Sequence, residues 1–247
     1  WTIPDVVKKN GVRVRVVDAD ASGEAQAVAV SNAFTIYGQL LLTAPNGAEA
    51  WTVLSSQNVT WTRTGSIANV KLEYSTNSGS TYPNSITAST DAATGTYAWT
   101  IPDSLSATAK VRVSDASDAA VLDESNAVFK IVGSFTVTAP NGGEKWTVGS
   151  SQNVTWTKVG SIANVKLEYS TDGGTTYPTV IVASTLAANL SYAWTLPNTP
   201  TATAKVRVSD VADATVLDVS NANFKIKAGL TVTAPNGGEV WTVGSAQ

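Results

Sequence analysis

Apolar and polar residues alternate along most of the chain. Val165, Leu167 and Tyr169 occupy one phase of this alternation, whereas Lys166 and Glu168 occupy the other. A period of two residues is typical of half-buried β-strands. No segment shows the spacing of three and four residues expected of an amphipathic helix. The same inward phase is predicted for Phe135, Val137, Val154, Trp156, Leu190, Tyr192, Trp194, Val206, Val208, Ala222, Phe224 and Ile226.

Turn signals separate these alternating runs. Residues 140–143 combine Pro, Asn and two Gly, whose backbone preferences suit a tight reversal. Residues 172–174 read Asp-Gly-Gly between two alternating runs, which favours a hairpin. About seven short strands with turns every 8 to 12 residues are typical of an Ig-like sandwich. The pattern therefore predicts an all-β fold made of Ig-like β-sandwiches.

An internal repeat organises the chain. The sequence TAPNG begins at Thr43, Thr138 and Thr233, so the step is 95 residues. Residues 43–137 and 138–232 align without a gap and are identical at 66 of 95 positions. Such self-similarity indicates tandem duplication. We therefore expect tandem Ig-like domains of about 95 residues each.

The repeat also predicts the domain boundaries. We expect complete Ig-like repeats at 38–132 and 133–227, with the N-terminal part of a further repeat at 228–247. Residues 1–37 are expected to be the C-terminal part of a divergent repeat, because WTIPD and VRVVD there match WTIPD and VRVSD of the next repeat. Very short linkers separate the repeats.

The two terminal segments each contain only part of a hydrophobic core. We therefore interpret the 247 residues as part of a longer repetitive polypeptide. Both segments are expected to be ordered strands whose inward residues are covered by protein from outside this chain. These inward residues include Val14, Val16, Phe34, Val232 and Trp241.

Composition narrows the classes of function. The chain has no Cys, Met or His, and 16 basic against 19 acidic residues give a net charge of −3. Thiol chemistry, His-based general bases and most metal sites are thereby excluded. The chain lacks the basic footprint that nucleic-acid binding needs, and no apolar run approaches the roughly 18 residues of a membrane span. We expect a protein that is not an enzyme, does not bind nucleic acid and does not span a membrane.

Several motifs together carry a resemblance to a known family. They are PNGGEKWTVGS from Pro140, NVKLEYSTDGGTTY from Asn164, YAW from Tyr192, VRVSD from Val206 and SNANF from Ser220. The series resembles the tandem Ig-like repeat of secreted bacterial and archaeal proteins. It is also similar to the N-terminal domain of the Ser/Thr-rich, GPI-anchored cell-wall family of yeast. The resemblance covers essentially the whole chain and implies an extracellular or cell-surface structural module without catalytic residues.

The segment from Ser170 to Tyr177 resembles the Asp-box of sialidases, with Tyr in place of the final Trp. That box is a hairpin device and not a catalytic one. The preceding repeat has Asn77 at the Asp position. Because Asx side chains hydrogen-bond to the backbone of their own turn, we predict a structural role for this motif.

Two equivalent clusters of aspartates are the candidate metal ligands. Their carboxylate oxygens could bind Ca²⁺ in a loop between strands. The alternative is turn capping by the same side chains, and it is favoured because the DxxD spacing lacks the dense ligand pattern of a calcium loop. No other cofactor is expected. The candidates are Asp115, Asp118 and Asp123 in one repeat and Asp210, Asp213 and Asp218 in the next.

Tryptophans are candidates for stacking against sugars, which would make a glycan a partner. Those in phase with inward residues are instead predicted to pack in the core, namely Trp61, Trp99, Trp156 and Trp194. For the tryptophans that follow the PNG turn two roles remain possible, to cover the end of the sandwich or to cover a neighbouring domain. They are Trp51, Trp146 and Trp241. Glycosylation sequons stand at Asn58, Asn153 and Asn189.

The outward charges suggest a ladder across strands. Lys166 and Glu168 are expected to face Lys205 and Arg207 at the surface. Each exposed pair would contribute only about 0 to 1 kcal/mol.

The near-identity of the repeats favours a structural function. We expect an extracellular segment of a surface fibre, stalk or filament that self-associates, since identical units at a constant step can build a regular assembly. The alternative is a multivalent adhesin or carbohydrate-binding array, with calcium as a candidate cofactor.

Overall fold

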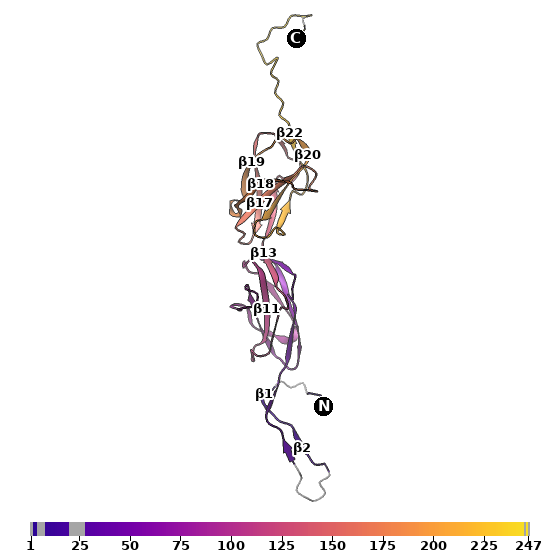
Figure 1. The fold of residues 1–247 in the computed structure, drawn as a ribbon, viewed down its shortest axis with the longest axis vertical. Coiled ribbons are helices and arrows are strands. Elements are labelled where there is room, and N and C mark those ends of the chain that lie inside the picture. The colour runs from indigo at the N-terminus through magenta and orange to yellow at the C-terminus, as the bar shows by residue number, and fades with distance from the viewer. Residues whose placement is uncertain (1, 4–7, 20–27, 245, 247) are drawn as a thin grey trace. The chain divides into compact units, whose positions relative to one another are not determined.

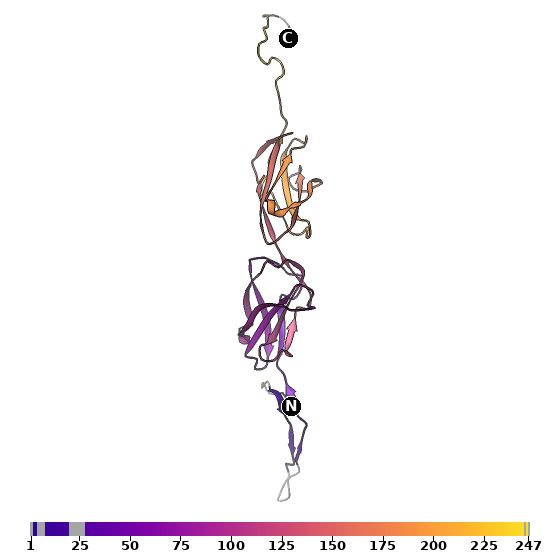
Figure 2. The same cartoon turned by 90° about the vertical axis from the view of Figure 1, so that its left-hand side faces the viewer.

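The protein, represented by a computed structural model, is described for residues 2–3, 8–19, 28–244 and 246. The chain divides into two compact units, Trp1–Gly133 and Ser134–Gln247. Each unit contains one complete β-sandwich (Figure 1, Figure 2). The helical segments in the described residues are two single turns of 3-10 helix, η1 (Ala92–Thr94) and η2 (Ala187–Asn189). The predicted all-β fold of tandem Ig-like sandwiches is therefore confirmed.

The sandwich of the first unit has nine strands. They are β5 (Gln39–Ala44), β6 (Ala50–Thr52), β7 (Ser56–Thr64), β8 (Asn69–Ser75), β9 (Asn84–Asp91), β10 (Thr96–Thr100), β11 (Ser106–Asp115), β12 (Leu122–Glu124) and β13 (Phe129–Val132). One sheet has the order β10-β7-β5, and the other has the order β6-β13-β11-β8-β9 with β12 paired to β11. The count exceeds the expected seven because the three-residue strands β6 and β12 form separately.

The second unit repeats this topology. Its strands are β14 (Ser134–Ala139), β15 (Lys145–Thr147), β16 (Ser151–Val159), β17 (Asn164–Ser170), β18 (Thr179–Leu186), β19 (Ser191–Thr195), β20 (Thr201–Asp210), β21 (Leu217–Val219) and β22 (Phe224–Lys227). The sheets have the orders β14-β16-β19 and β15-β22-β20-β17-β18, with β21 paired to β20. Strands β15 and β22 are parallel, as are β6 and β13.

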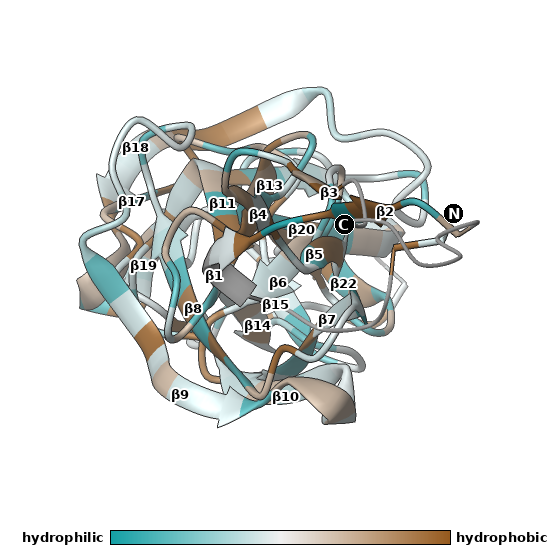
Figure 3. Cartoon of the chain, turned by 90° about the horizontal axis from the view of Figure 1, so that it is seen from below, coloured by the Kyte–Doolittle hydropathy of each residue, from teal (hydrophilic) through white to brown (hydrophobic). Residues whose placement is uncertain are grey.

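The core lies where the alternating residues of the two sheets meet. Val165, Leu167, Val206 and Val208 are fully buried, as the period of two predicts. Figure 3 shows hydrophobic positions interspersed with pale and hydrophilic ones along the strands. The inward faces of the two sheets pack against each other and form a tightly packed core.

Two residues predicted to point inward do not. Leu190 follows η2 in a left-handed backbone conformation and is 42% exposed. Ala222 precedes β22 and lies exposed against the PNG turn, where a Cβ on Gly142 would come within 2.6 Å of the Ala222 Cβ. Both residues lie outside the strands, so the alternation does not apply to them.

The N-terminal segment forms two short antiparallel pairs. Strand β1 (Lys8–Val12) pairs with β4 (Phe34–Ile36), and β2 (Arg15–Val17) pairs with β3 (Val28–Val30). This is the pairing pattern of β11 with β13 and β12 in the complete sandwich. Residues of this segment predicted to be inward are nonetheless accessible, with Val16 65% exposed. Assignment of 1–37 to a divergent repeat stays a prediction.

The C-terminal segment differs from expectation. Residues 228–244 and 246 contain no strand, although ordered strands were expected there. Val232 is 67% exposed, whereas the equivalent Val137 is 1% exposed. Strand β14 needs β16 as its partner, and no described strand pairs with 228–247. Without such a partner the segment has nothing against which to bury its apolar residues.

Candidate functional site

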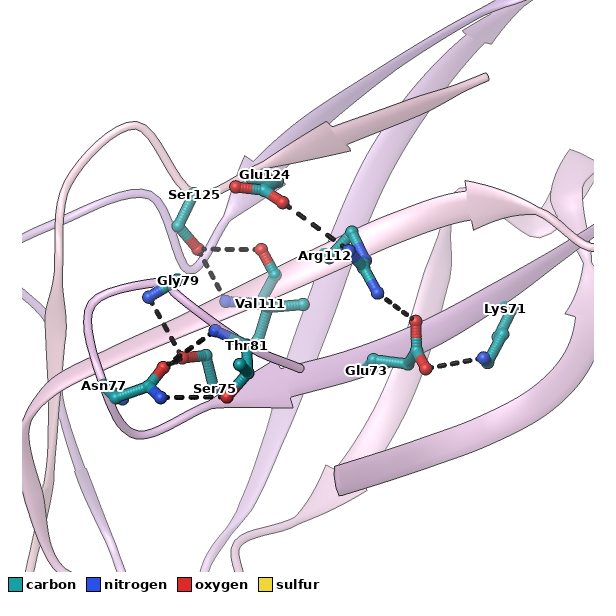
Figure 4. Close-up of polar contacts among 10 residues, drawn as sticks. All are labelled: Lys71, Glu73, Ser75, Asn77, Gly79, Thr81, Val111, Arg112, Glu124 and Ser125. Carbon is teal, nitrogen blue, oxygen red and sulfur yellow. Dashed lines mark hydrogen bonds and ion pairs between the residues drawn. The ribbon is translucent and has the colours of Figure 1, made fainter. Parts of the chain in front are cut away.

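A hairpin brace follows β8 in the first unit. The Ser75 hydroxyl donates to Asn77 Oδ1 at 2.7 Å and accepts from the backbone N–H of Gly79 at 3.0 Å. The side-chain amide of Asn77 donates to the Thr81 hydroxyl at 2.8 Å (Figure 4). These bonds close the turn on itself, so the motif supports the hairpin and leaves few polar atoms for a ligand.

The second unit builds the same brace with an acid. The Thr176 hydroxyl donates to Asp172 Oδ2 at 2.6 Å, and Gly174 N–H donates to the Ser170 hydroxyl at 2.9 Å. Hydrogen bonds from Ser170 and Thr176 hold the pKa of the Asp172 carboxyl well below its usual range. The carboxylate is therefore committed to the turn, in agreement with the predicted hairpin role.

Each brace is followed by a tyrosine that lies against the outer face of the larger sheet. The guanidinium of Arg112 lies 4.3 Å from the centre of the Tyr82 ring, and that of Arg207 lies 4.5 Å from the Tyr177 ring. Such contacts are favourable cation–π interactions. Burial raises the pKa of both tyrosines. The tyrosines thus cover part of a surface that the alternation leaves exposed.

A buried glutamate lies beside each of these arginines. Glu168 is 5% exposed, and its carboxylate accepts hydrogen bonds from Arg207 at 2.7 and 3.0 Å and pairs with Lys166 at 2.6 Å. Glu73 accepts one hydrogen bond from Arg112 at 2.9 Å and pairs with Lys71, and Arg112 also lies 3.9 Å from Glu124 (Figure 4). Burial would raise the pKa of each glutamate, but the hydrogen bonds from its Lys and Arg outweigh this and lower it.

This arrangement corrects the prediction of an exposed charge ladder. Glu168 does face Arg207 in register, but Lys205 lies opposite Ser170. The pair is less exposed than predicted, because the Glu168 side chain is only 7% exposed. Charge-assisted hydrogen bonds of this kind are stronger than hydrogen bonds between neutral groups.

A shallow depression adjoins each glutamate. Its volume is about 390 Å³ in the first unit and about 240 Å³ in the second. In both units the lining includes Lys, Glu, Arg, Ser and Asp at equivalent positions. These are Lys71, Glu73, Arg112, Ser114 and Asp115 in the first unit and Lys166, Glu168, Arg207, Ser209 and Asp210 in the second. The depression offers donors and acceptors for a small polar ligand.

Four of the six candidate calcium ligands cap turns. Asp115 Oδ1 accepts from the N–H and hydroxyl of Ser117, and Asp118 Oδ1 accepts from Ala120 N–H. Asp210 and Asp213 repeat this, with acceptance from Ala212 and Thr215. Asx side chains favour this local bonding.

The other two aspartates join the two sheets of each sandwich. Asp123 Oδ2 accepts from the backbone N–H of Leu42 at 2.7 Å, and Asp218 Oδ2 accepts from that of Val137 at 2.7 Å. Each bond links residues 81 positions apart in the sequence. Among the described residues, no group of three or more acidic side chains is placed to hold a metal ion. Calcium binding stays a prediction. A calcium ion would compete with these hydrogen bonds for the carboxylate oxygens.

The tryptophans whose phase in the alternation predicts burial are buried in the core. Trp61 and Trp156 are 3% and 2% exposed, and their indole N–H groups donate to Ala92 and Ala187 carbonyls at 3.1 Å. Trp99 and Trp194 are buried as well. The tryptophans after the first two PNG turns also join the aromatic cluster, with Trp51 5.1 Å from Phe129 and Trp146 5.1 Å from Phe224. The buried rings are therefore unavailable to stack against a flat sugar, whereas Trp146 is only half-buried.

The remaining repeat motifs also have internal partners. The Ser220 hydroxyl donates to the Pro140 carbonyl at 2.7 Å, and Glu144 accepts from the N–H groups of Asn141 and Gly142. Asn221 N–H donates to Asn141 Oδ1 at 2.6 Å. The PNGGE and SNA motifs are thus paired across 80 residues, a link that local sequence spacing does not reveal.

Comparisons with known proteins find similarity of fold alone. No protein-family profile matches the chain, and no curated protein sequence matches it. The fibronectin(III)-like modules of Clostridium thermocellum CbhA are 19% identical, over 77% of this chain and 94% of that one, with a TM-score of 0.26. The N-terminal four Ig domains of Dscam1 isoform 8.4 are 9% identical, over 76% and 46%, with a TM-score of 0.35. A chimeric titin Z1Z2-Z1Z2 tandem is 11% identical, over 77% and 100%, with a TM-score of 0.26. At these values the similarity carries no conclusion about activity or partners.

In the part of the chain that the structure describes, no helix is long and apolar enough to cross a bilayer.

Proposed function

We propose that this chain is a segment of an extracellular or cell-surface structural protein, a fibre, stalk or filament built from tandem Ig-like domains. The observation that carries the proposal is the pair of sandwiches with one topology and 66 identical residues in 95. Units of identical shape at a constant step can present identical contacts along an assembly. The resemblance to repeats of secreted microbial proteins and of the yeast cell-wall family supports the same location.

The internal use of the polar motifs supports a role that is not enzymatic. The repeated Ser, Asn, Asp and Glu side chains bond to backbone or to neighbouring charges within each sandwich. A structural module needs these bonds for stability and needs no reaction centre. The acidic net charge and the absence of His and Cys are consistent with this role.

Electron microscopy of the assembled polypeptide tests the proposal. We expect continuous fibres with an axial repeat that corresponds to one 95-residue unit. Single separated chains at all concentrations would contradict it. The control is a chain in which Trp61 and Trp156 are both replaced by Ala, because unfolded sandwiches should form no regular fibre.

The alternative function is a multivalent adhesin or carbohydrate-binding array. It is favoured by the equivalent depressions beside Glu73 and Glu168, since two weak sites on one chain gain avidity. A glycan array with and without calcium tests it. Saturable binding that is lost in an Arg112→Ala and Arg207→Ala double variant would support this alternative, and absence of binding would exclude it.

A further inference from the structure

Each sandwich has an open edge in its larger sheet. Strands β9 and β18 stand at the end of the strand order, and each pairs with one neighbour, β8 or β17, in the part of the chain that the structure describes. The outer side of such a strand presents backbone N–H and C=O groups that another strand can pair with. The two edges occupy equivalent places in the repeat, so they can be compared directly.

The side chains of these two edge strands differ at a larger share of positions than the repeat as a whole. Strand β9 reads NSITASTD and β18 reads TVIVASTL, so four of eight positions differ, against 29 of 95 overall. Ser85, Thr87 and Asp91 become Val180, Val182 and Leu186. Val180 is 46% exposed and Leu186 is 59% exposed. The second unit therefore has an apolar edge where the first has a polar one.

The usual protection of an edge is reduced at β18. Charged residues, prolines and bulges keep exposed edges from pairing. The register against the neighbouring strand shifts at the same two places in β9 and β18, so bulges do not distinguish the two edges. Strand β9 ends in Asp91, whereas β18 contains no charge and no proline. Its β-branched run is the kind of segment that adds readily to another strand.

In the second unit, Leu186 at the end of β18 and Leu190 after η2 occupy positions where the backbone favours other residues. Asp91 caps η1 by accepting from Ala93 N–H at 2.8 Å, but Leu186 gives η2 no side-chain cap. Leu190 has φ of +56°, a conformation that favours the glycine found at the equivalent position 95. A leucine in this left-handed conformation is strained. Strain that is retained together with exposed apolar surface points to a use for that surface.

We propose that β18 pairs edge to edge, in antiparallel register, with β18 of a second copy of this chain. A two-fold axis through such a pair places each residue opposite a residue of the same strand. Because β18 carries no charge, no like charges meet in such a pair. Strand β9 is a poorer partner because it carries Asp91, whose charge loses hydration when a second strand covers the edge. This lateral contact rests on the proposed function, since it gives the predicted self-association a surface.

Sedimentation equilibrium of the 247-residue chain tests the contact. We expect a reversible dimer, with a dissociation constant between about 1 µM and 1 mM. The decisive variant is Val180→Ser with Val182→Thr and Leu186→Asp, which installs the residues that the first unit already folds with. We expect it to weaken the dimer by about tenfold or more while circular dichroism stays unchanged.

The matched control is the reciprocal variant, Ser85→Val with Thr87→Val and Asp91→Leu. It gives the chain a second apolar edge, so we expect species larger than dimers. A native chain that stays monomeric at about 1 mM, or a triple variant at β18 that dimerises as well as the native chain, would overturn the proposal. Fibres in the microscope without this dimer would refute the β18 contact alone. A β18 dimer without fibres would refute the fibre proposal alone.

Discussion

Single residues hold the two sheets of each sandwich together, and Trp156 is among the largest of them. It is 2% exposed and its indole donates to the Ala187 carbonyl. Trp156→Ala should lower the free energy of unfolding by about 3 to 5 kcal/mol, as expected for deletion of a large buried aromatic ring. Chemical denaturation measures this loss. Trp241, which is 51% exposed, is the control, and its replacement by Ala should change stability by less than about 0.5 kcal/mol.

Asp218 distinguishes a structural carboxylate from a metal ligand. Its Oδ2 accepts from Val137 N–H at 2.7 Å and so ties β21 to β14 of the facing sheet. Asp218→Ala should cost about 1 to 3 kcal/mol, because a hydrogen bond to a charged group is lost and the N–H is left without it. The measurement is denaturation with calcium and with a chelator. If the carboxylate is structural, the loss is the same in both, whereas a calcium site would show the loss only with calcium.

Leu190 is a residue at which the fold can be improved. A leucine with φ of +56° is strained, and the first unit has Gly95 there with φ of +65°. Leu190→Gly should raise the stability of the second unit by about 0.5 to 1 kcal/mol, since the relief of left-handed strain exceeds the entropic cost of glycine. A thermal melt measures the change. The reverse variant Gly95→Leu should destabilise the first unit, and a gain there would contradict the argument.

At the scale of elements, Glu168 connects β17 to β20 through Arg207 and makes this connection sensitive to pH. Its pKa is lowered in the folded protein from the usual value of 4.5. A lowered pKa contributes stability that is present above the unfolded value and lost as pH falls through the folded value. Stability should therefore decrease below pH 4.5. Urea denaturation across this range should give a shallower dependence for Glu168→Gln than for the native chain, and equal slopes would contradict the assignment.

The strands themselves could be predicted from the sequence, and the environment of their outer faces could not. Period-two alternation placed Val165, Leu167 and Trp156 in the core, where the structure has them. The same alternation placed Glu168 at the surface, but the structure buries it in ion pairs with Arg207 and Lys166. That burial depends on a cation contributed by a strand 39 residues away, which no local pattern records. Alternation describes which side of a strand faces the core and nothing about what covers the other side.

The candidate sites show the same limit. Turn chemistry predicted the hairpin role of Asp172 correctly, because its partners lie within four residues. The partner of Asp218 is Val137, 81 residues earlier, so the sequence favoured a turn cap, with a calcium ligand as the alternative, over a bond between sheets. Leu190 was assigned to a strand because its apolar phase matched, although the backbone at that position belongs to the end of a 3-10 turn. Residues that act within a turn are thus predictable, and residues that act across the sandwich are not.

At the scale of the whole molecule, the C-terminal segment tests whether the repeat is the folding unit. Residues 228–247 correspond to 133–152 of the complete repeat, yet Val232 and Trp241 are exposed while Val137 is buried. If only partner strands are missing, a copy of residues 153–227 added after Gln247 should complete a further sandwich. Apolar burial is the main force that would drive this folding.

We therefore expect residues 230–243 to become protected from hydrogen exchange in the extended chain, and Trp241 fluorescence to shift to shorter wavelength. The matched control adds the same residues with the added copy of Trp156 replaced by Ala. In that chain the new core lacks its largest side chain, so protection should be weak or absent. Protection of 230–243 in the original 247-residue chain alone would show that the segment folds without these partners. That result would contradict the view that one 95-residue repeat is the unit of folding.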